Sequence, residues 1–212
     1  FNPIIMANVI KLRKGLDVNL KGKAAKEEFQ VKKPAVYALM PDDFTGMKPK
    51  VVVKENDVVK VGDSLFVDKN HPEIKFVSPV SGRVTMVERG DRRKVLSVRV
   101  EADAEQQYVD FGKKNVGQMT AQEVKDLLLE SGLFGFFRQR PYDVTANPSD
   151  TPKAIFVSAF NSMPLAADFE YVLRGREADF QAGLDALAKM AKTYLGVSSK
   201  QTATAFTAAK NV

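Results

Sequence analysis

The chain has 212 residues, of which 44% are hydrophobic and 27% are charged, an ordinary composition for a soluble globular protein. It has no cysteine and one histidine, which excludes disulfides, thiolate metal sites and iron–sulfur ligation and argues against a His-based metal site or a Ser-His-Asp triad. No apolar run reaches the roughly 18 residues of a membrane span, so we expect a cytoplasmic protein.

The formal net charge of +6 predicts a basic surface. Much of the excess lies before residue 60, and a second cluster comprises Arg89, Arg92, Arg93 and Lys94. A basic face can attract nucleic acid, anionic lipid or an acidic protein partner, although a solvated surface explains it equally well. No aromatic residues interleave with the basic stretch, which weakens the nucleic-acid interpretation.

The residue pattern divides the chain into three parts. Residues 1–6 are expected to be a leader or tag, with Met6 as the natural start. Residues 7–112 are expected to form a β-rich module with an N-terminal strand at 9–12, and residues 113–212 part of an α/β domain. One strand with its helices cannot bury both faces of a sheet, so this last part is expected to belong to a longer protein.

The β-rich module contains short apolar runs of the strand type, separated by Pro and Gly turn signals. These runs predict strands at 51–53, 64–67, 74–77 and 96–100. In the last of them, alternation places Leu96, Val98 and Val100 on one face.

The second half of the chain changes to a helical period. Thr120 and Glu123 form a capping-box pattern that begins a helix, and Ser131–Gly132 ends it. The apolar run 154–157 predicts a strand of the kind buried in a parallel sheet.

A longer amphipathic helix is predicted after that strand. It spans 177–195, with an apolar stripe on one side and Gly196 as its cap. A further strand is predicted at 204–207, and the composition of 143–152 is typical of an exposed loop.

Two turn-rich segments of the β module resemble the biotinyl/lipoyl carrier module, a small β-sandwich. Gly62, Pro79 and Gly82 match the turn positions of that module. Asn56 stands where its first glycine is usual, and Asn tolerates the left-handed backbone that such a turn needs. The pattern therefore predicts the β-sandwich fold.

A carrier module presents a modified lysine in the hairpin between those two segments. This chain has Lys69 there, after an aspartate as in lipoylated domains. The spacing from Lys69 to Pro79 is longer than expected of a lipoyl domain, and the Met-Lys pair of biotin carriers is missing, so an unmodified surface lysine is favoured. His71 is interpreted as a turn residue and a poor metal ligand.

Several segments taken together resemble one family, the NqrA subunits of the bacterial Na+-translocating NADH:quinone oxidoreductase. The segments are 14–17, 46–49, the carrier-like module, 131–141 and 153–167. The family is similar in fold to the NADH- and flavin-binding subunit of respiratory complex I and to the RnfC protein of the Rnf complex. The resemblance covers residues 7–212 and implies a mixed fold, a barrel-sandwich module followed by an incomplete Rossmann-like α/β domain.

In the complex I relative, the loop after the helix is glycine-rich, because backbone must approach the flavin phosphate closely. The matching central positions of this chain are Phe136, Phe137, Arg138 and Gln139. An acidic E-x-E-P run that faces the cofactor in the relatives is replaced here at both carboxylates, by Asn161 and Met163. The resemblance therefore implies a degenerate site that binds neither FMN nor NADH.

The contents of that degenerate site are left open between two interpretations. Phe134, Phe136 and Phe137 could line an apolar slot for a quinone ring, with Arg138 or Arg140 polarising a carbonyl oxygen. Alternatively, the phenylalanines fill the flavin cavity and the arginines pair with carboxylates, which we prefer.

The leading functional hypothesis is a non-flavin accessory subunit of a membrane redox pump, bound peripherally at the cytoplasmic face of the bacterial inner membrane. The resemblance implies that FMN, FAD, riboflavin and iron reside only in partner membrane subunits, and that this chain has no cofactor, catalytic residue, metal ligand or turnover of its own. Quinone is the one ligand left open. The alternatives are a carrier protein with Lys69 acylated by lipoate or biotin, and a basic nucleic-acid-binding β-barrel.

Overall fold

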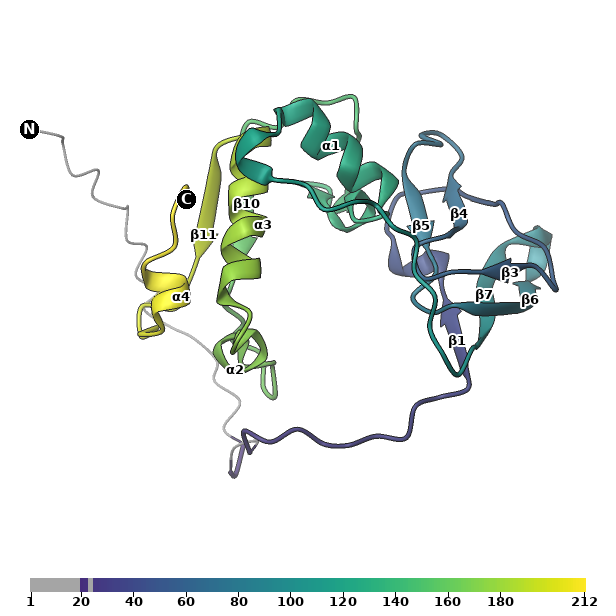
Figure 1. Cartoon of the computed structure of the whole chain (residues 1–212), viewed down its shortest axis with the longest axis horizontal. Helices are drawn as coiled ribbons and strands as arrows, with labels where there is room; N and C mark the ends of the chain where they lie inside the picture. Colours follow the sequence, from purple (N-terminus) through teal and green to yellow (C-terminus); the bar gives the residue numbers. More distant parts are fainter. Residues whose placement is uncertain (1–19, 23–24) are drawn as a thin grey trace, which may run out of the picture.

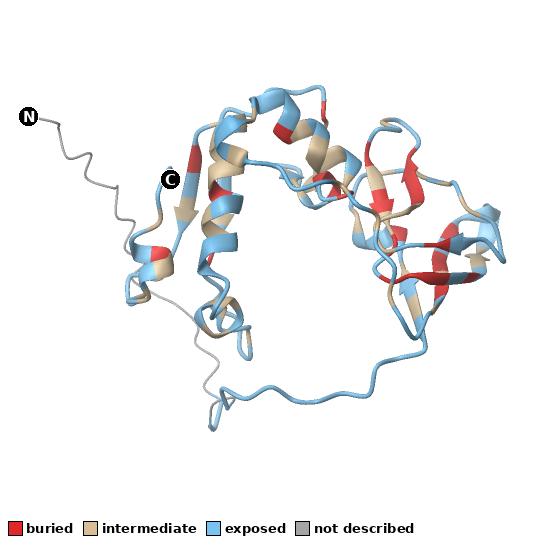
Figure 2. Cartoon of the chain, in the orientation of Figure 1, coloured by how far each residue is buried: buried red, intermediate tan, exposed pale blue. Residues whose placement is uncertain are grey.

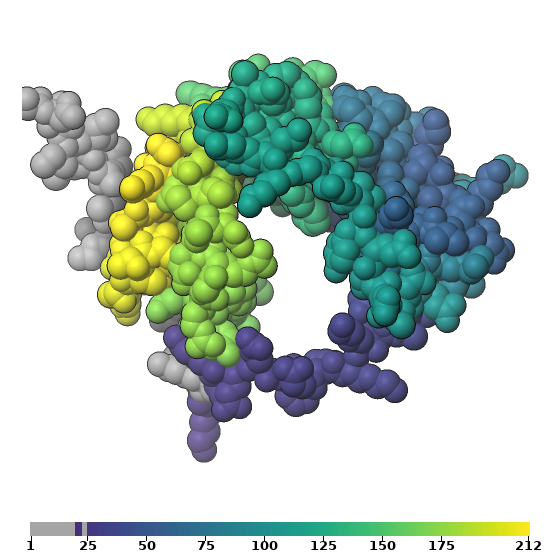
Figure 3. Space-filling model, viewed as in Figure 1, coloured from purple at the N-terminus to yellow at the C-terminus, as the bar shows by residue number. Residues whose placement is uncertain are grey.

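The computed structural model describes residues 20–22 and 25–212. Within these ranges the chain forms a β module and an α/β unit, with α1 (Ala121–Glu130) lying between them (Figure 1). The space-filling view shows an open centre bordered by the two units, α1 and the segment that precedes the first strand (Figure 3). The expected leader, N-terminal strand and 14–17 segment lie outside the described residues.

Two antiparallel sheets make up the β module. The four-stranded sheet has the order β1 (Val36–Leu39), β7 (Val95–Ala102), β6 (Gly82–Arg89) and β3 (Val58–Val59). The three-stranded sheet has the order β2 (Pro49–Val51), β4 (Ser64–Asp68) and β5 (Lys75–Val77). The strands predicted at 64–67 and 74–77 are confirmed, whereas the one predicted at 51–53 begins and ends earlier, as β2.

The core of the module lies between the two sheets and is the largest buried region in Figure 2. Phe66 and Phe76 stack in its centre with ring centroids 5.1 Å apart, and both are at most 2% exposed. Phe44 covers Phe76 at 4.4 Å. Asn56 adopts φ +74, which confirms the left-handed turn expected where the carrier pattern has a glycine.

The predicted facing of Leu96 is wrong. The register of β6 and β7 shifts next to this residue, with Arg89 opposite Val95 and Glu88 opposite Ser97, so Leu96 is the extra residue of a β-bulge. A bulge inverts the alternation beyond it. Leu96 is consequently 37% exposed, whereas Val95 is buried with Val98 and Val100.

A short parallel sheet and four helices form the rest of the described chain. The sheet pairs β10 (Ile155–Ser158) with β11 (Thr193–Gly196). The helices are α1, α2 (Phe169–Leu173), α3 (Glu177–Met190) and α4 (Thr204–Thr207). Single 3-10 turns and one two-stranded hairpin complete the elements: η1 (Pro41–Asp43), η2 (Asp91–Arg93), η3 (Val116–Gln118), η4 (Phe134–Phe136), β8 (Arg138–Gln139) and β9 (Val144–Thr145).

Two of the predicted elements of the α/β unit are wrong. The helix predicted at 177–195 ends at Met190, because the aromatic and β-branched run 193–195 pairs with β10 as the parallel strand β11, and Gly196 lies in that strand instead of capping the helix. The strand predicted at 204–207 is the helix α4. Its Phe206 is buried and meets the ring of Phe180 edge-on at 5.5 Å.

Candidate functional site

The candidate site is the loop 131–146, whose position is set by α1. The capping box that begins α1 is confirmed: Glu123 N donates to Thr120 Oγ1 at 3.2 Å, and Thr120 N donates to Glu123 Oε2 at 2.7 Å. The second bond stabilises the charged form and holds the pKa of the Glu123 carboxyl below its usual value. At the other end of α1, Glu130 lies 2.6 Å from Lys75 Nζ on β5.

The two glycines of the loop allow it to lie directly against β5. Gly132 adopts φ +76, and a Cβ at this position would lie 2.7 Å from Cγ1 of Val77. A Cβ at Gly135 would lie 2.7 Å from Cε1 of Phe76. Such distances are far shorter than van der Waals contact, so both positions require glycine for packing on the β module.

The phenylalanines of the loop face different environments. Phe134 is 4% exposed and belongs to the core of the β module, and Phe137 packs on it with ring centroids 5.4 Å apart. Phe136 is 69% exposed, with its ring edge-on to Phe44 at 5.7 Å. The structure therefore brings Phe134 and Phe137 together and leaves Phe136 at the surface.

Arg138 joins the hairpin of β8 and β9 to the β module. Its guanidinium donates to the backbone carbonyl of Asp43 at 3.0 Å and to that of Asp143 at 3.2 Å. Beside it, Thr145 N donates to the Thr45 carbonyl at 2.8 Å. The expected carboxylate partner of Arg138 is wrong, because two carbonyl oxygens receive its protons. Arg140 does approach a carboxylate, that of Asp143 at 3.7 Å, in an exposed pair.

The remaining predicted site residues lie at the surface or in hydrogen-bonded turns. Gln139 Nε2 donates to the Asp150 carboxylate at 3.3 Å. Asn161 Oδ1 accepts from the backbone N–H of Met163 at 2.9 Å, and Met163 is 70% exposed. Among the described residues, no hydrogen bond or ring contact joins Asn161 or Met163 to the loop 134–140.

Two cavities stand out in the described part of the chain, and neither includes a residue of the loop 131–146. One, of about 350 Å³, lies between α2 and α4. Close to it, Lys26 lies 2.9 Å from the Asp168 carboxylate, and this hydrogen bond lowers the pKa of Asp168. The other, of about 450 Å³, is a shallow depression lined by residues of the β module. These two cavities therefore do not supply a slot at Phe136.

The hairpin that carries Lys69 is built by its neighbours. Asp68 is 5% exposed, and its carboxylate accepts the backbone N–H groups of Lys48 at 3.2 Å and Asn70 at 3.1 Å. Lys69 is exposed. His71 closes the turn by accepting from the N–H of Ile74 through its carbonyl at 2.9 Å, which confirms its interpretation as a turn residue. Residues 20–22 and 25–212 contain no cluster of three His, Asp or Glu side chains arranged to hold a metal ion.

Sequence comparison gives the family of the chain. A family model described as the NqrA N-terminal barrel-sandwich hybrid domain matches residues 10–103, and a second, described as the NqrA second alpha/beta domain, matches residues 119–212. The chain belongs to the NqrA family. The matches agree with the β module of two sheets and the α/β unit described above.

The curated relatives bear one name. Proteins named as the A-type subunit of Na(+)-translocating NADH-quinone reductase are 35% identical over 190 residues in Pseudomonas aeruginosa (strain UCBPP-PA14) and 36% identical over 186 residues in Yersinia pseudotuberculosis serotype O:1b (strain IP 31758). The matches cover 88% and 86% of this chain and 42% and 41% of those relatives. The NqrA-family chain thus spans less than half the length of the relatives it matches.

The helices of the described ranges include none that is both long and apolar enough to cross a membrane. Sequence reasoning found the loop 131–141 but missed its docking on the β module. The only local signal was the pair Gly132 and Gly135, because glycine at two sites in an apolar loop also indicates close backbone packing.

Proposed function

We propose that this NqrA-family chain acts within the NqrA subunit of a Na+-translocating NADH:quinone reductase complex, bound peripherally at the cytoplasmic face of the membrane. The observation that carries this proposal is the match of both domains, at 35% identity, to relatives named for that complex. Its role is to assemble membrane partner subunits, and FMN, FAD, riboflavin and iron are held by those partners. The barrel-sandwich module would be related to lipoyl carriers and the α/β unit to Rossmann-like flavin domains.

The absence of flavin chemistry from the chain is part of the proposal. A phosphate cradle needs backbone N–H groups that can approach the ligand closely. In the loop 131–141, the side chains of Phe134 and Phe137 pack against the β module and the guanidinium of Arg138 is bonded to two carbonyl groups. These contacts support a loop used for packing between the two units.

Co-purification tests the assignment to the complex. The tagged full-length protein should recover flavoprotein subunits and NADH:quinone reductase activity from gently solubilised membranes of its own organism. Recovery of neither would contradict the proposal. The flavin part has a separate test, because addition of the purified chain should leave the fluorescence of free FMN unchanged, and saturable quenching would overturn it.

Quinone contact is a second candidate function, and the exposure of Phe136 favours it. Its ring is 69% exposed, and the exposed guanidinium of Arg140 belongs to the same loop. An aromatic face beside a cation can receive a quinone ring and its carbonyl oxygen. Such a contact would form at the surface, with a neighbouring subunit supplying the other wall.

The carrier alternative rests on Lys69, which is exposed in the β4–β5 hairpin as a carrier lysine must be. Intact mass spectrometry of the protein purified from its own organism separates the two functions. A lipoyl or biotinyl adduct on Lys69 would establish the carrier function, whereas the unmodified mass would remove it.

A further inference from the structure

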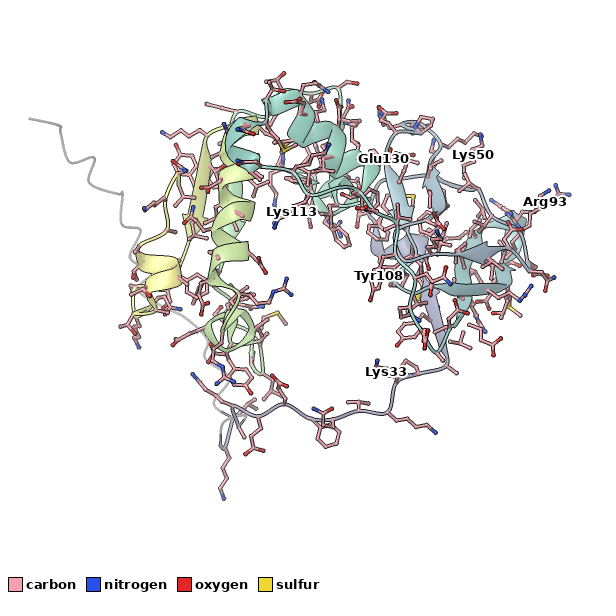
Figure 4. All side chains as sticks on the ribbon, viewed as in Figure 1. Lys33, Lys50, Arg93, Tyr108, Lys113 and Glu130 are labelled. Carbon is pink, nitrogen blue, oxygen red and sulfur yellow. The ribbon has the colours of Figure 1, made fainter. Side chains whose placement is uncertain are left out.

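We propose that the tip of the β6–β7 hairpin binds the anionic headgroups of a phospholipid surface through Arg92 and Arg93. The turn 89–94 carries four basic side chains against one acidic residue. Figure 4 places Arg93 at the outer edge of the β module, on the side away from the α/β unit. The inference depends on the proposed function only in that translocation of Na+ requires a membrane.

The charges next to the tip are already paired, and those of Arg92 and Arg93 are not. Lys94 lies 2.6 Å from the Asp42 carboxylate, and Glu88 lies 2.7 Å from Arg99. In the ranges that the structure describes, no carboxylate forms an ion pair with Arg92 or Arg93, and both are exposed. Two guanidinium groups are therefore available to an external anion.

The backbone at the tip holds both arginines in an uncommon conformation. Arg92 has φ +53 and Arg93 has φ +60, the left-handed region that residues with a Cβ rarely adopt. The turn is closed around them by a bond from Gly90 N to the Lys94 carbonyl at 2.8 Å and by Arg89, whose guanidinium donates to the Arg93 carbonyl at 3.4 Å. Backbone strain of this kind is concentrated at functional sites.

An apolar side chain lies beside the basic tip. Leu96 is 37% exposed because of the β-bulge, and it packs over Gly90, where a Cβ would lie 3.1 Å from Leu96 Cδ1. Basic side chains that surround an exposed leucine are typical of segments that rest at a membrane interface. An acidic protein surface would match the charge but gives no role to Leu96, so the observations favour lipid.

Flotation of the purified full chain with phospholipid vesicles tests the inference. Phosphatidylcholine vesicles that contain phosphatidylglycerol should bind the chain, and vesicles of phosphatidylcholine alone should not. Each basic residue near an anionic surface contributes about fivefold in affinity, so the double variant Arg92→Asn, Arg93→Asn should bind roughly 30-fold more weakly. Asparagine suits left-handed backbone, so this variant removes charge while keeping the turn.

Two matched variants complete the test. Arg92→Lys, Arg93→Lys keeps the charge and should bind as the unaltered chain does. Lys113→Asn, Lys114→Asn removes the same charge from the exposed connection before α1 and should change binding little. Equal binding of the Arg-to-Asn variant and the unaltered chain would overturn the inference. It would also be overturned if the chain ignored phosphatidylglycerol and the variant instead lost partner subunits in detergent extracts, since this outcome identifies an acidic protein surface.

Discussion

Gly135 lies against Phe76 so closely that a Cβ at position 135 would be 2.7 Å from the Cε1 atom of the ring. The ring is itself only 2% exposed and stacked on Phe66, so it has no room to move aside. This contact joins the loop after α1 to the centre of the β module.

Substitution of Gly135 should therefore destabilise the protein. We expect Gly135→Ala to lower the free energy of unfolding by about 1–3 kcal/mol, the usual cost of overpacking a core. Urea denaturation of the full chain measures this. Gly183→Ala is the matched control, because Gly183 lies inside α3 with nothing within 4 Å of the new methyl group. It should stabilise by about 0.5–1 kcal/mol, and equal effects of the two changes would contradict the packing role of Gly135.

Arg138 and Arg140 should differ although they are two positions apart. Arg138→Ala removes two hydrogen bonds to backbone carbonyls and should cost about 1–2 kcal/mol in unfolding free energy. Arg140→Ala removes only an exposed ion pair of 3.7 Å and should cost under about 0.5 kcal/mol. Limited proteolysis should cleave the β8–β9 hairpin faster in the first variant alone. Indistinguishable variants would show that the Arg138 bonds do not hold the hairpin.

The capping box gives a pH dependence of defined sign. The hydrogen bond from Thr120 lowers the pKa of Glu123 in the folded protein. The stabilisation is then fully present above the unfolded pKa of the carboxyl and is lost as the pH falls through the folded pKa. We expect Glu123→Gln to reduce stability at neutral pH and to match the unaltered chain in acid. A stability difference that does not shrink in acid would rule out this linkage.

The quinone contact predicts a difference between two phenylalanines of one loop. Phe136→Ala removes an exposed ring and should weaken quinone affinity of the assembled complex without unfolding the chain. Phe134→Ala removes a core ring and should cost about 3–5 kcal/mol of stability. Quinone titration of the purified complex checks the first and urea denaturation the second. Unchanged affinity in a Phe136→Ala, Phe137→Ala variant would eliminate the contact.

Local signals predicted the elements that depend on neighbouring residues. The capping box at Thr120, the left-handed turn at Asn56 and the strands β4 and β5 all follow from residue type and spacing within a few positions. The end of α3 was not predictable in this way. Its apolar stripe continues past Met190, and only pairing with β10 converts the next residues into β11.

The interpretation of the loop 131–141 depended on contacts distant in sequence. No periodicity connects Phe134 with Phe76, or Arg138 with the carbonyl of Asp43, and both contacts join the two units. Alternation likewise could not place Leu96, because the β-bulge depends on the partner strand β6.

The position of Phe134 has a consequence for how the protein unfolds. The sequence families divide the chain into a segment at 10–103 and another at 119–212, yet this ring from the second segment completes the hydrophobic core of the first. The two segments therefore share part of their stability and should melt in a single cooperative transition. A fragment cut after residue 103 would expose the Phe76 face that the loop covers, so it should be less stable and more prone to aggregate than the intact chain.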